Sequence, residues 1–227
     1  MSSNLLYTIA CISLFELTTQ NMTGYIVGGD FSRIEDFPYS AFLHLKCGES
    51  NLICGGSILT QLIILTAGHC VKACKNIKTF SIHAYTGDIR EYKGTKSKVI
   101  DFKIHEHYDE IYLHNDLALL ILDKELIFSD KVQRVVILKK PPINEFAMIA
   151  GWGLIDVSTV HFIIDDHTST VLFKYNVFCM FHQENGTRTN LLRNTTQKII
   201  SRQVCQEELS KTPEGTICGS FKSHPEK

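Results

Sequence analysis

The 227-residue chain lacks several features that define whole classes of protein. Its composition, 44% hydrophobic and 21% charged, includes no low-complexity tract and no internal repeat, which excludes a disordered or collagen-like chain. The formal net charge is −1 and no run of like charges occurs, so a nucleic-acid-binding surface is not expected. What remains is a globular protein of one or two units with a proper core.

A long apolar run is also missing near the amino terminus. The apolar stretch there, residues 5–15, is too short to cross a bilayer, which takes about 20 residues. Its length is typical of the hydrophobic part of a signal peptide, although no Lys or Arg precedes it. We therefore expect residues 1–25 to be a signal peptide with a short propeptide, and no membrane partner. A misplaced start in front of a missing leader is the alternative.

The cysteines and glycosylation sequons point to the compartment. The chain has eight cysteines, and Asn-x-Thr sequons occur at Asn21, Asn185 and Asn194. Cysteines that pair as disulfides and asparagines that carry glycans both belong to an oxidising, secretory setting. We therefore expect an extracellular, secreted protein.

From Tyr39 onward, short apolar runs alternate with polar or glycine-containing turns. Strands at such spacing predict an all-β barrel or sandwich, and no stretch before residue 190 shows a helical period. The predicted strands are residues 41–45, 52–53, 58–65, 99–104, 117–122, 132–138 and 146–150.

One short segment presents a histidine beside a cysteine. The apolar run that ends at Leu65 leads into Thr-Ala-Gly and then His69 and Cys70. A disulfide between Cys54 and Cys70 would close a loop of roughly 15 residues and would contribute about 3 kcal/mol in the chain-entropy account. A histidine held on such a turn is a positioned imidazole, and its ordinary pKa near 6.5 suits general-base catalysis.

These residues carry a resemblance. The sequence CGGSIL at 54–59, followed by LTAGHC at 65–70, resembles the histidine region of trypsin-like serine proteases, with Gly68 where the usual form has alanine. Three more segments match family motifs in order: IVGG at 26–29, NDLALL at 115–120 and GWG at 151–153. The resemblance implies two antiparallel β-barrels of the trypsin/chymotrypsin type, one from residues 26–139 and an incomplete one from residues 140–227.

The resemblance also implies roles for single residues. His69 would be the general base of a serine-type endopeptidase, and Asp116 would fix its orientation and tautomer. An aspartate at the mouth of an apolar strand is costly unless its carboxylate has partners; a strand-start aspartate that caps a turn is the alternative. The implied partners are polypeptide substrates or protease inhibitors, with no nucleic acid, and we expect a monomer.

Activation and disulfides follow from the same resemblance. Cleavage between Tyr25 and Ile26 would free an amine that pairs with a buried aspartate, since a buried charge requires a partner. Tyr25 stands where a trypsin-type activator needs Arg or Lys, so the activating enzyme is left open. Disulfides are predicted for Cys54–Cys70 and Cys205–Cys218.

Two other groups of residues could form a disulfide or a metal site. Cys47 and Cys74 flank the histidine region, and an additional disulfide is their expected role. His105, Glu106 and His107 could suggest a metal site, but histidines two apart on a β segment need not point the same way, and no third ligand is recognisable. We expect no metal and no cofactor.

The chain departs from the family in two places. Residues 154–184 contain no Gly or Pro and are rich in Val, Ile and Phe, which predicts an insertion foreign to the fold, translated non-coding sequence rather than a functional loop. After Cys218 the sequence contains no Gly-Asp-Ser-Gly-Gly, so the nucleophilic serine, the oxyanion amides and the specificity pocket are missing and the chain is expected to be inactive. The alternatives are a non-catalytic protease homologue that acts by binding, or a truncated or mis-spliced product without function.

Overall fold

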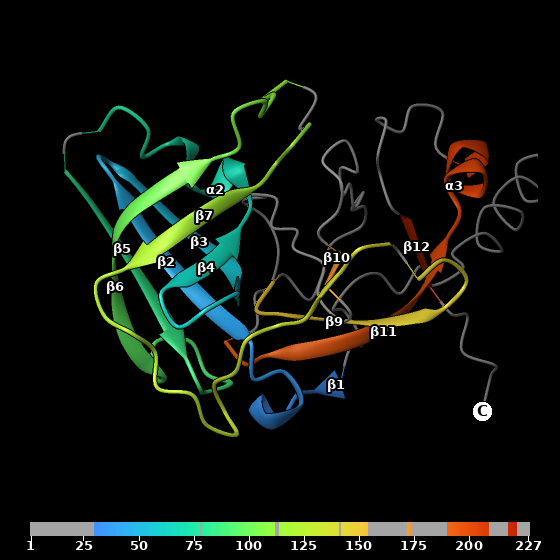
Figure 1. Cartoon of the computed structure of the whole chain (residues 1–227), viewed down its shortest axis with the longest axis horizontal. Coiled ribbons are helices and arrows are strands. Elements are labelled where there is room, and N and C mark those ends of the chain that lie inside the picture. Colours follow the sequence, from blue (N-terminus) through green and yellow to red (C-terminus); the bar gives the residue numbers. More distant parts are fainter. Residues whose placement is uncertain are drawn as a thin grey trace, which may run out of the picture.

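The structure, a computed structural model, describes residues 30–77, 79–111, 114–140, 142–153, 172–173, 190–208 and 218–221. These residues form a closed β-barrel beside a second, smaller sheet (Figure 1). The chain is therefore mostly β, as the alternating apolar runs predict. Among the described residues, no helix has the length and apolar character needed to cross a membrane.

Six antiparallel strands close the barrel in the order β2-β3-β4-β7-β6-β5. Neighbours in sequence pair through hairpins, whereas the pairs β2–β5 and β4–β7 join segments far apart in the chain. The barrel strands are β2 (Ser40–Cys47), β3 (Ser50–Ile58), β4 (Ile63–Thr66), β5 (Phe80–Thr86), β6 (Thr95–Ile104) and β7 (Ala118–Leu122).

Alternating side chains fill the barrel. On β2, Ala41, Leu43 and Leu45 are fully buried, and Ile82 on β5 and Leu120 on β7 meet them in the same cluster. Because side chains of a strand alternate between the two faces, the residues between them on each strand lie on the outer face. Each fully buried Leu or Ile side chain contributes about 1.5–3 kcal/mol through the apolar surface it removes from water.

The second sheet is built around β11 (Arg193–Ile200). This strand pairs with β1 (Asp30–Phe31), β9 (Phe146–Gly151) and β12 (Cys218–Phe221), and a two-stranded pair joins β8 (Ile137–Leu138) to β10 (Leu172–Phe173). Two short helical elements, the 3₁₀ helix η1 (Ile34–Asp36) and the α-helix α3 (Arg202–Glu208), complete this part.

An aromatic cluster joins the barrel to the second sheet. Trp152, at the end of β9, is 3% exposed and packs edge-on against Phe42 from the outer face of β2, with ring centroids 5.6 Å apart. The indole Nε1 donates a hydrogen bond to the Ile89 carbonyl (2.6 Å), so the polar edge of this buried ring is satisfied. Leu192 is fully buried in the same cluster, and its N–H also donates to Ile89 (2.7 Å). The GWG segment therefore fixes how the two sheets meet.

Two of the predicted strands, the apolar runs at 58–65 and 132–138, are only partly strand in the structure. The run at 58–65 contains a turn between β3 and β4, in which the Thr60 hydroxyl accepts the N–H groups of Leu62 and Ile63. In the run at 132–138 only β8 is a strand. Before β8, the backbone N–H of Gln133 donates to the Pro38 carbonyl and that of Val135 to the Ile58 carbonyl, so these residues form no regular ladder. Within the barrel, the prediction missed β5, which alternates apolar and polar residues and contains no continuous apolar run.

Candidate functional site

His69 is positioned by the end of β4 and the start of a short helix. The strand ends at Thr66, whose hydroxyl donates to the Gly55 carbonyl on β3 (2.8 Å) and so ties the two strands beneath the turn. Ala67 stays extended (φ −77°, ψ 147°), and α2 (Gly68–Lys72) begins directly after it. The predicted disulfide Cys54–Cys70 is present and joins α2 to β3, with Cα atoms 6.3 Å apart.

Asp116 reaches the same place from the start of β7. The register of β4 and β7 pairs Thr66 with Ala118, so the residues just after the first strand meet those just before the second. Asn115 precedes the aspartate with a positive φ of 53°, a conformation that asparagine tolerates, and its side-chain amide donates to the His107 carbonyl (3.0 Å). This turn aims the carboxylate at α2.

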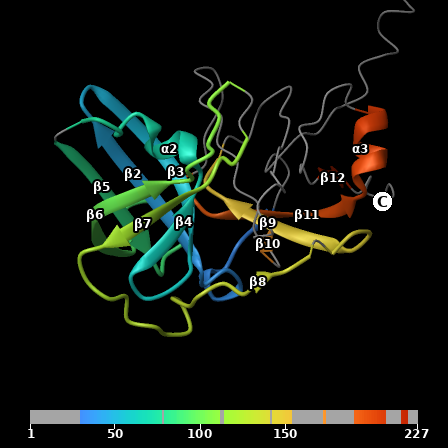
Figure 2. The ribbon, with the colours of Figure 1, turned by 45° about the horizontal axis from the view of Figure 1, so that its top comes forward.

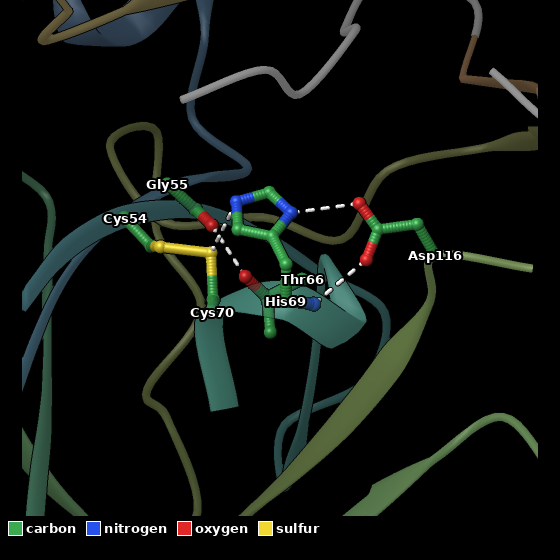
Figure 3. A network of polar contacts seen from close by, with 6 residues as sticks. All are labelled: Cys54, Gly55, Thr66, His69, Cys70 and Asp116. Atoms are coloured by element: carbon green, nitrogen blue, oxygen red, sulfur yellow. Dashed lines mark hydrogen bonds and ion pairs between the residues drawn. A yellow bond between two sulfur atoms is a disulfide. The ribbon is translucent and has the colours of Figure 1, made fainter. Parts of the chain in front are cut away.

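The Asp116 carboxylate makes two hydrogen bonds to His69, one to its ring and one to its backbone (Figure 3). Asp116 Oδ2 lies 2.7 Å from His69 Nδ1, and Oδ1 accepts the backbone N–H of His69, also at 2.7 Å. Because a carboxylate can only accept, the ring proton must sit on Nδ1, which leaves the lone pair on Nε2. Both side chains are mostly buried, with 32% and 21% of their surface exposed. The pair can therefore take up a proton at Nε2 while the carboxylate holds the ring.

Comparison with known proteins identifies the family of the chain. The family model described as Trypsin matches residues 26–174. The chain belongs to the trypsin family.

Individual relatives agree with this assignment. Hypodermin-B of Hypoderma lineatum is 30% identical over 189 residues, which cover 82% of this chain and 61% of hypodermin-B. Hypodermin-A of the same organism is 35% identical over 132 residues, covering 57% of this chain and 49% of that protein. The chain thus spans about three-fifths of the length of one curated relative and half of the other.

Solved structures share the fold. The structure of HL collagenase aligns with a TM-score of 0.60 at 23% identity, covering 85% of this chain and 72% of that chain. A scabies mite inactivated protease paralogue, S-D1, aligns with a TM-score of 0.62 at 19% identity, covering 86% of this chain and 73% of that chain. The trypsin-family architecture of paired β-structures predicted from the motifs is therefore confirmed.

Gly68, the departure from the usual trypsin-family motif, sits close to the dyad formed by His69 and Asp116. A Cβ at this position would lie 3.2 Å from Asp116 Oδ1 and 3.3 Å from Ile104 Cγ2. Those contacts are tight, so an alanine here requires the neighbours to move by a few tenths of an ångström. The glycine leaves the carboxylate slightly more room than the usual residue does.

Three further residues surround the dyad that the motifs do not reveal. Lys72 on α2 pairs with Glu110 (2.6 Å), and its ammonium lies 5.9 Å from the centre of the Tyr108 ring. Burial, with smaller contributions from Asp116 and Glu110, raises the pKa of Tyr108 to about 12. The phenol therefore stays neutral beside the carboxylate. Tyr108 and Glu110 come from the segment between β6 and β7, and Lys72 lies on α2 just after the LTAGHC motif, so no motif identified them.

The residues considered for a metal site do not form one that fits. The ligand atoms of Cys54, His69 and Cys70 lie within 4.8 Å of one another, but both sulfurs are consumed by the disulfide and carry no thiolate. His105 and His107 lie in a turn after β6 rather than in a strand, and the His107 N–H donates to His105 Nδ1 (3.2 Å). The prediction that these two histidines lie on a β segment was therefore wrong.

The remaining predicted site residues are the other cysteines and the two activation residues. Cys47 and Cys74 form a disulfide, with Cα atoms 4.7 Å apart. Cys218 is buried and disulfide-bonded, but the side chain of Cys205 lies outside the described residues, so this pairing stays a prediction. The activation residues Tyr25 and Ile26 also lie outside them.

The unusual stretch at 154–184 is described only in part. Leu172–Phe173 pair with Ile137–Leu138, and the trypsin-family match continues to residue 174. The rest of the stretch lies outside the described residues, so its origin as a foreign insertion stays a prediction.

Proposed function

We propose that the protein is a serine-type endopeptidase in which His69 is the general base and Asp116 positions it. The observation that carries the proposal is the two-point bond between them. One carboxylate oxygen holds the ring nitrogen and the other holds the backbone of the same residue. Rotation of the imidazole is thereby restricted, and Nε2, which lies 3.5 Å from Cys70 Sγ, is the ring atom that would accept a proton.

The chemistry of this proposal is acyl transfer to a serine. Nε2 of His69 takes the proton of the serine hydroxyl as the oxygen attacks a peptide carbonyl, and it later gives that proton to the leaving amine. Asp116 stays ionised throughout and stabilises the imidazolium. Polypeptides are the proposed substrates, and cleavage between Tyr25 and Ile26 is the proposed activation step.

For the 227 residues on their own, we propose that hydrolysis is negligible. The sequence contains no Gly-Asp-Ser-Gly-Gly, and Ser57, in the CGGS segment, is fully buried in β3. Removing the nucleophile alone costs a serine protease on the order of 10⁶ in turnover. In this form the dyad would be correctly built but without the group that it activates.

A non-catalytic role is the second candidate. Such a homologue would have the trypsin-family fold with the serine of the second barrel replaced, and would bind polypeptides without cleaving them. One structural relative is named as an inactivated protease paralogue, but at 19% identity that likeness speaks only to the fold. Binding of a protease inhibitor or a peptide without turnover would support this candidate.

An oxidising, extracellular setting fits both candidates. The disulfides Cys47–Cys74 and Cys54–Cys70 lie in the barrel, and such bonds persist in secreted proteins, whereas the cytosol keeps thiols reduced. We therefore propose secretion.

The decisive experiment compares the chain with a fusion that supplies a nucleophile. In the fusion, a trypsin-family carboxy-terminal segment containing Gly-Asp-Ser-Gly-Gly follows Gly219. After cleavage before Ile26, both proteins are tested for peptide hydrolysis and for labelling by a fluorophosphonate probe. We expect the fusion to hydrolyse peptide and to be labelled, and the 227-residue chain to do neither.

Variants of the fusion then test the dyad. His69→Ala should lower turnover on the order of 10⁶-fold and Asp116→Asn about 10⁴-fold. The matched control His83→Gln changes a histidine on β5, a strand that pairs with neither β4 nor β7, and should leave turnover within a factor of two. Equal turnover in the His69 and His83 variants would contradict the proposed general base, and hydrolysis by the unextended chain would contradict its proposed inactivity.

A further inference from the structure

The outer face of the barrel gathers basic side chains from three neighbouring strands. The ladder places His44 of β2 beside His83 of β5, and His83 beside Lys98 of β6. Lys46 and Lys96 lie two residues from His44 and Lys98 on the same faces of their strands. Lys46 lies opposite Ser81 and Lys96 opposite Tyr85, so the five side chains form a diagonal row across the three strands, the basic face, with Lys46 and Lys96 at its two ends.

Among the described residues, no carboxylate forms an ion pair with the lysines of the basic face, Lys46, Lys96 and Lys98. All three lysines are exposed. The nearest acid, Asp123, uses Oδ1 to accept the backbone N–H of Lys98 (3.2 Å) instead. A local excess of positive charge therefore exists on a chain whose formal net charge is −1.

The basic face is open and bordered by aromatic rings. β5 and β6 lie on the side of the barrel farthest from the second sheet in both views (Figures 1 and 2). Tyr92 is 43% exposed and packs edge-on against the His44 ring at 5.4 Å, and Lys96 lies 5.9 Å from the centre of the Tyr85 ring. Charged groups and a partly exposed ring are thus available side by side.

We propose that the basic face binds a linear sulfated polysaccharide. Sulfate groups would contact Lys46, Lys96 and Lys98, and the exposed ring of Tyr92 would pack against sugar carbons. Neutralising closely spaced cations with a polyanion releases condensed counterions, which makes such binding favourable and dependent on salt. This surface lies apart from His69 and Asp116, so the inference does not depend on peptidase activity.

Two observations favour a sulfated glycan over a nucleic acid. The face contains lysines and histidines but no arginine, and the planar guanidinium is the group best suited to bidentate recognition of phosphates and bases. The two barrel disulfides fit an oxidising compartment, and sulfated glycans are the principal polyanions outside cells. An acidic peptide would meet the same charges, and the experiment below separates it.

His83, at the centre of the basic face, makes the binding sensitive to acid. Burial, followed by the charges of Lys96, His44 and Lys98, lowers the pKa of His83, while Asp123 opposes this effect. His44 Nε2 lies 2.7 Å from Asn51 Oδ1 on β3, and Lys46 is the remaining charged neighbour on β2. A bound polyanion favours the protonated imidazole of His83, so affinity should rise as pH falls below neutrality.

The experiment measures binding of the full 227-residue chain to heparin by calorimetry. Fully desulfated heparin, single-stranded DNA of equal charge and polyglutamate serve as competing polyanions. We expect heparin to bind more tightly than the other three, with a log–log salt slope of about −2 to −3 for three lysines. Affinity should increase several-fold from pH 7.5 to 5.5, and His83→Gln should reduce that gain.

Matched charge variants test the location. Lys96→Gln/Lys98→Gln should weaken heparin binding by about 10- to 30-fold, whereas the control Lys139→Gln/Lys140→Gln, which removes two exposed lysines after β8, should change it less than twofold. In the unmodified protein, heparin should protect Lys96 and Lys98 from amine acetylation but leave Lys139 and Lys140 reactive. Equal effects of the two double variants, or equal protection of the two pairs, would overturn the proposal. DNA or polyglutamate that binds as tightly as heparin would overturn the choice of a sulfated glycan.

Discussion

Replacing Asp116 with asparagine has different effects on the two hydrogen bonds that this residue makes to His69. The backbone N–H of His69 can only donate a hydrogen bond. The amide oxygen of the new side chain can accept it, so this oxygen remains bonded to the backbone. The amide nitrogen must then face Nδ1, and because it donates, the ring proton has to move to Nε2. We therefore expect Asp116→Asn to reverse the tautomer of His69 and to abolish the basic Nε2.

The energetic cost follows from the same geometry. A hydrogen bond to a charged group contributes about 1.5–3 kcal/mol when buried, and the partial exposure of both side chains places this one at the lower end. Asp116→Asn should therefore lower the free energy of unfolding by about 1–2 kcal/mol. Asp116→Ala, which removes both bonds, should cost about twice as much.

Two measurements check this prediction. Long-range ¹H–¹⁵N correlation spectra, recorded at a pH where the imidazole is neutral, distinguish the protonated from the unprotonated ring nitrogen. Urea denaturation gives the change in stability, and Asp130→Asn, at an exposed aspartate, serves as the control. A His69 ring that keeps its proton on Nδ1 in Asp116→Asn would refute the reasoning, as would equal stability of the Asp116 and Asp130 variants.

Three further predictions concern disulfide, acid and alkaline behaviour. Cys54→Ser/Cys70→Ser opens a disulfide with a sequence separation of 16, and should lower the free energy of unfolding in urea by about 3 kcal/mol; a loss below about 1 kcal/mol would contradict the chain-entropy account. The hydrogen bond from Arg90 lowers the pKa of Asp88 to about 2, so its contribution to stability is present above about pH 4 and is lost as pH falls toward 2. Arg90→Gln should therefore be less stable than the parent at pH 6, and chemical denaturation should find this difference gone at pH 2; a difference that persists there would have another origin. The raised pKa of Tyr108 adds stability that is present below pH 10 and lost between pH 10 and 12. Tyr108→Phe should remove this alkaline loss and one phenol that titrates near pH 12 in absorbance at 295 nm, and an unchanged titration curve would speak against the burial of Tyr108.

The parts of the site that were predictable are those encoded by contiguous sequence. The segments around His69 and Asp116 each carry a motif of several residues, so their resemblance to the trypsin family identifies the pair from the sequence alone. Gly151–Gly153 likewise marked the place where the second sheet meets the barrel. In each case a short stretch of chain contains both the functional side chain and the turn that aims it.

The parts that were not predictable are formed by register between distant strands. Lys46, Lys96 and Lys98 are scattered in sequence and form no charge run, so composition suggested a surface without a polyanion site. They come together because β2, β5 and β6 are neighbours, and β5 itself was missed because its polar residues interrupt the apolar pattern. A net charge near zero excludes an overall field of one sign, but it does not exclude a local one.

The pairing of β4 with β7 has a consequence for the lifetime of the dyad. His69 follows Thr66 and Asp116 precedes Ala118, and these two strand residues are direct partners in the ladder. A fluctuation that separates the two strands also separates the imidazole from the carboxylate. Amide hydrogen exchange along Ile63–Thr66 and Ala118–Leu122 therefore measures how often the dyad comes apart, and its opening should have the free energy of the barrel rather than that of a loop.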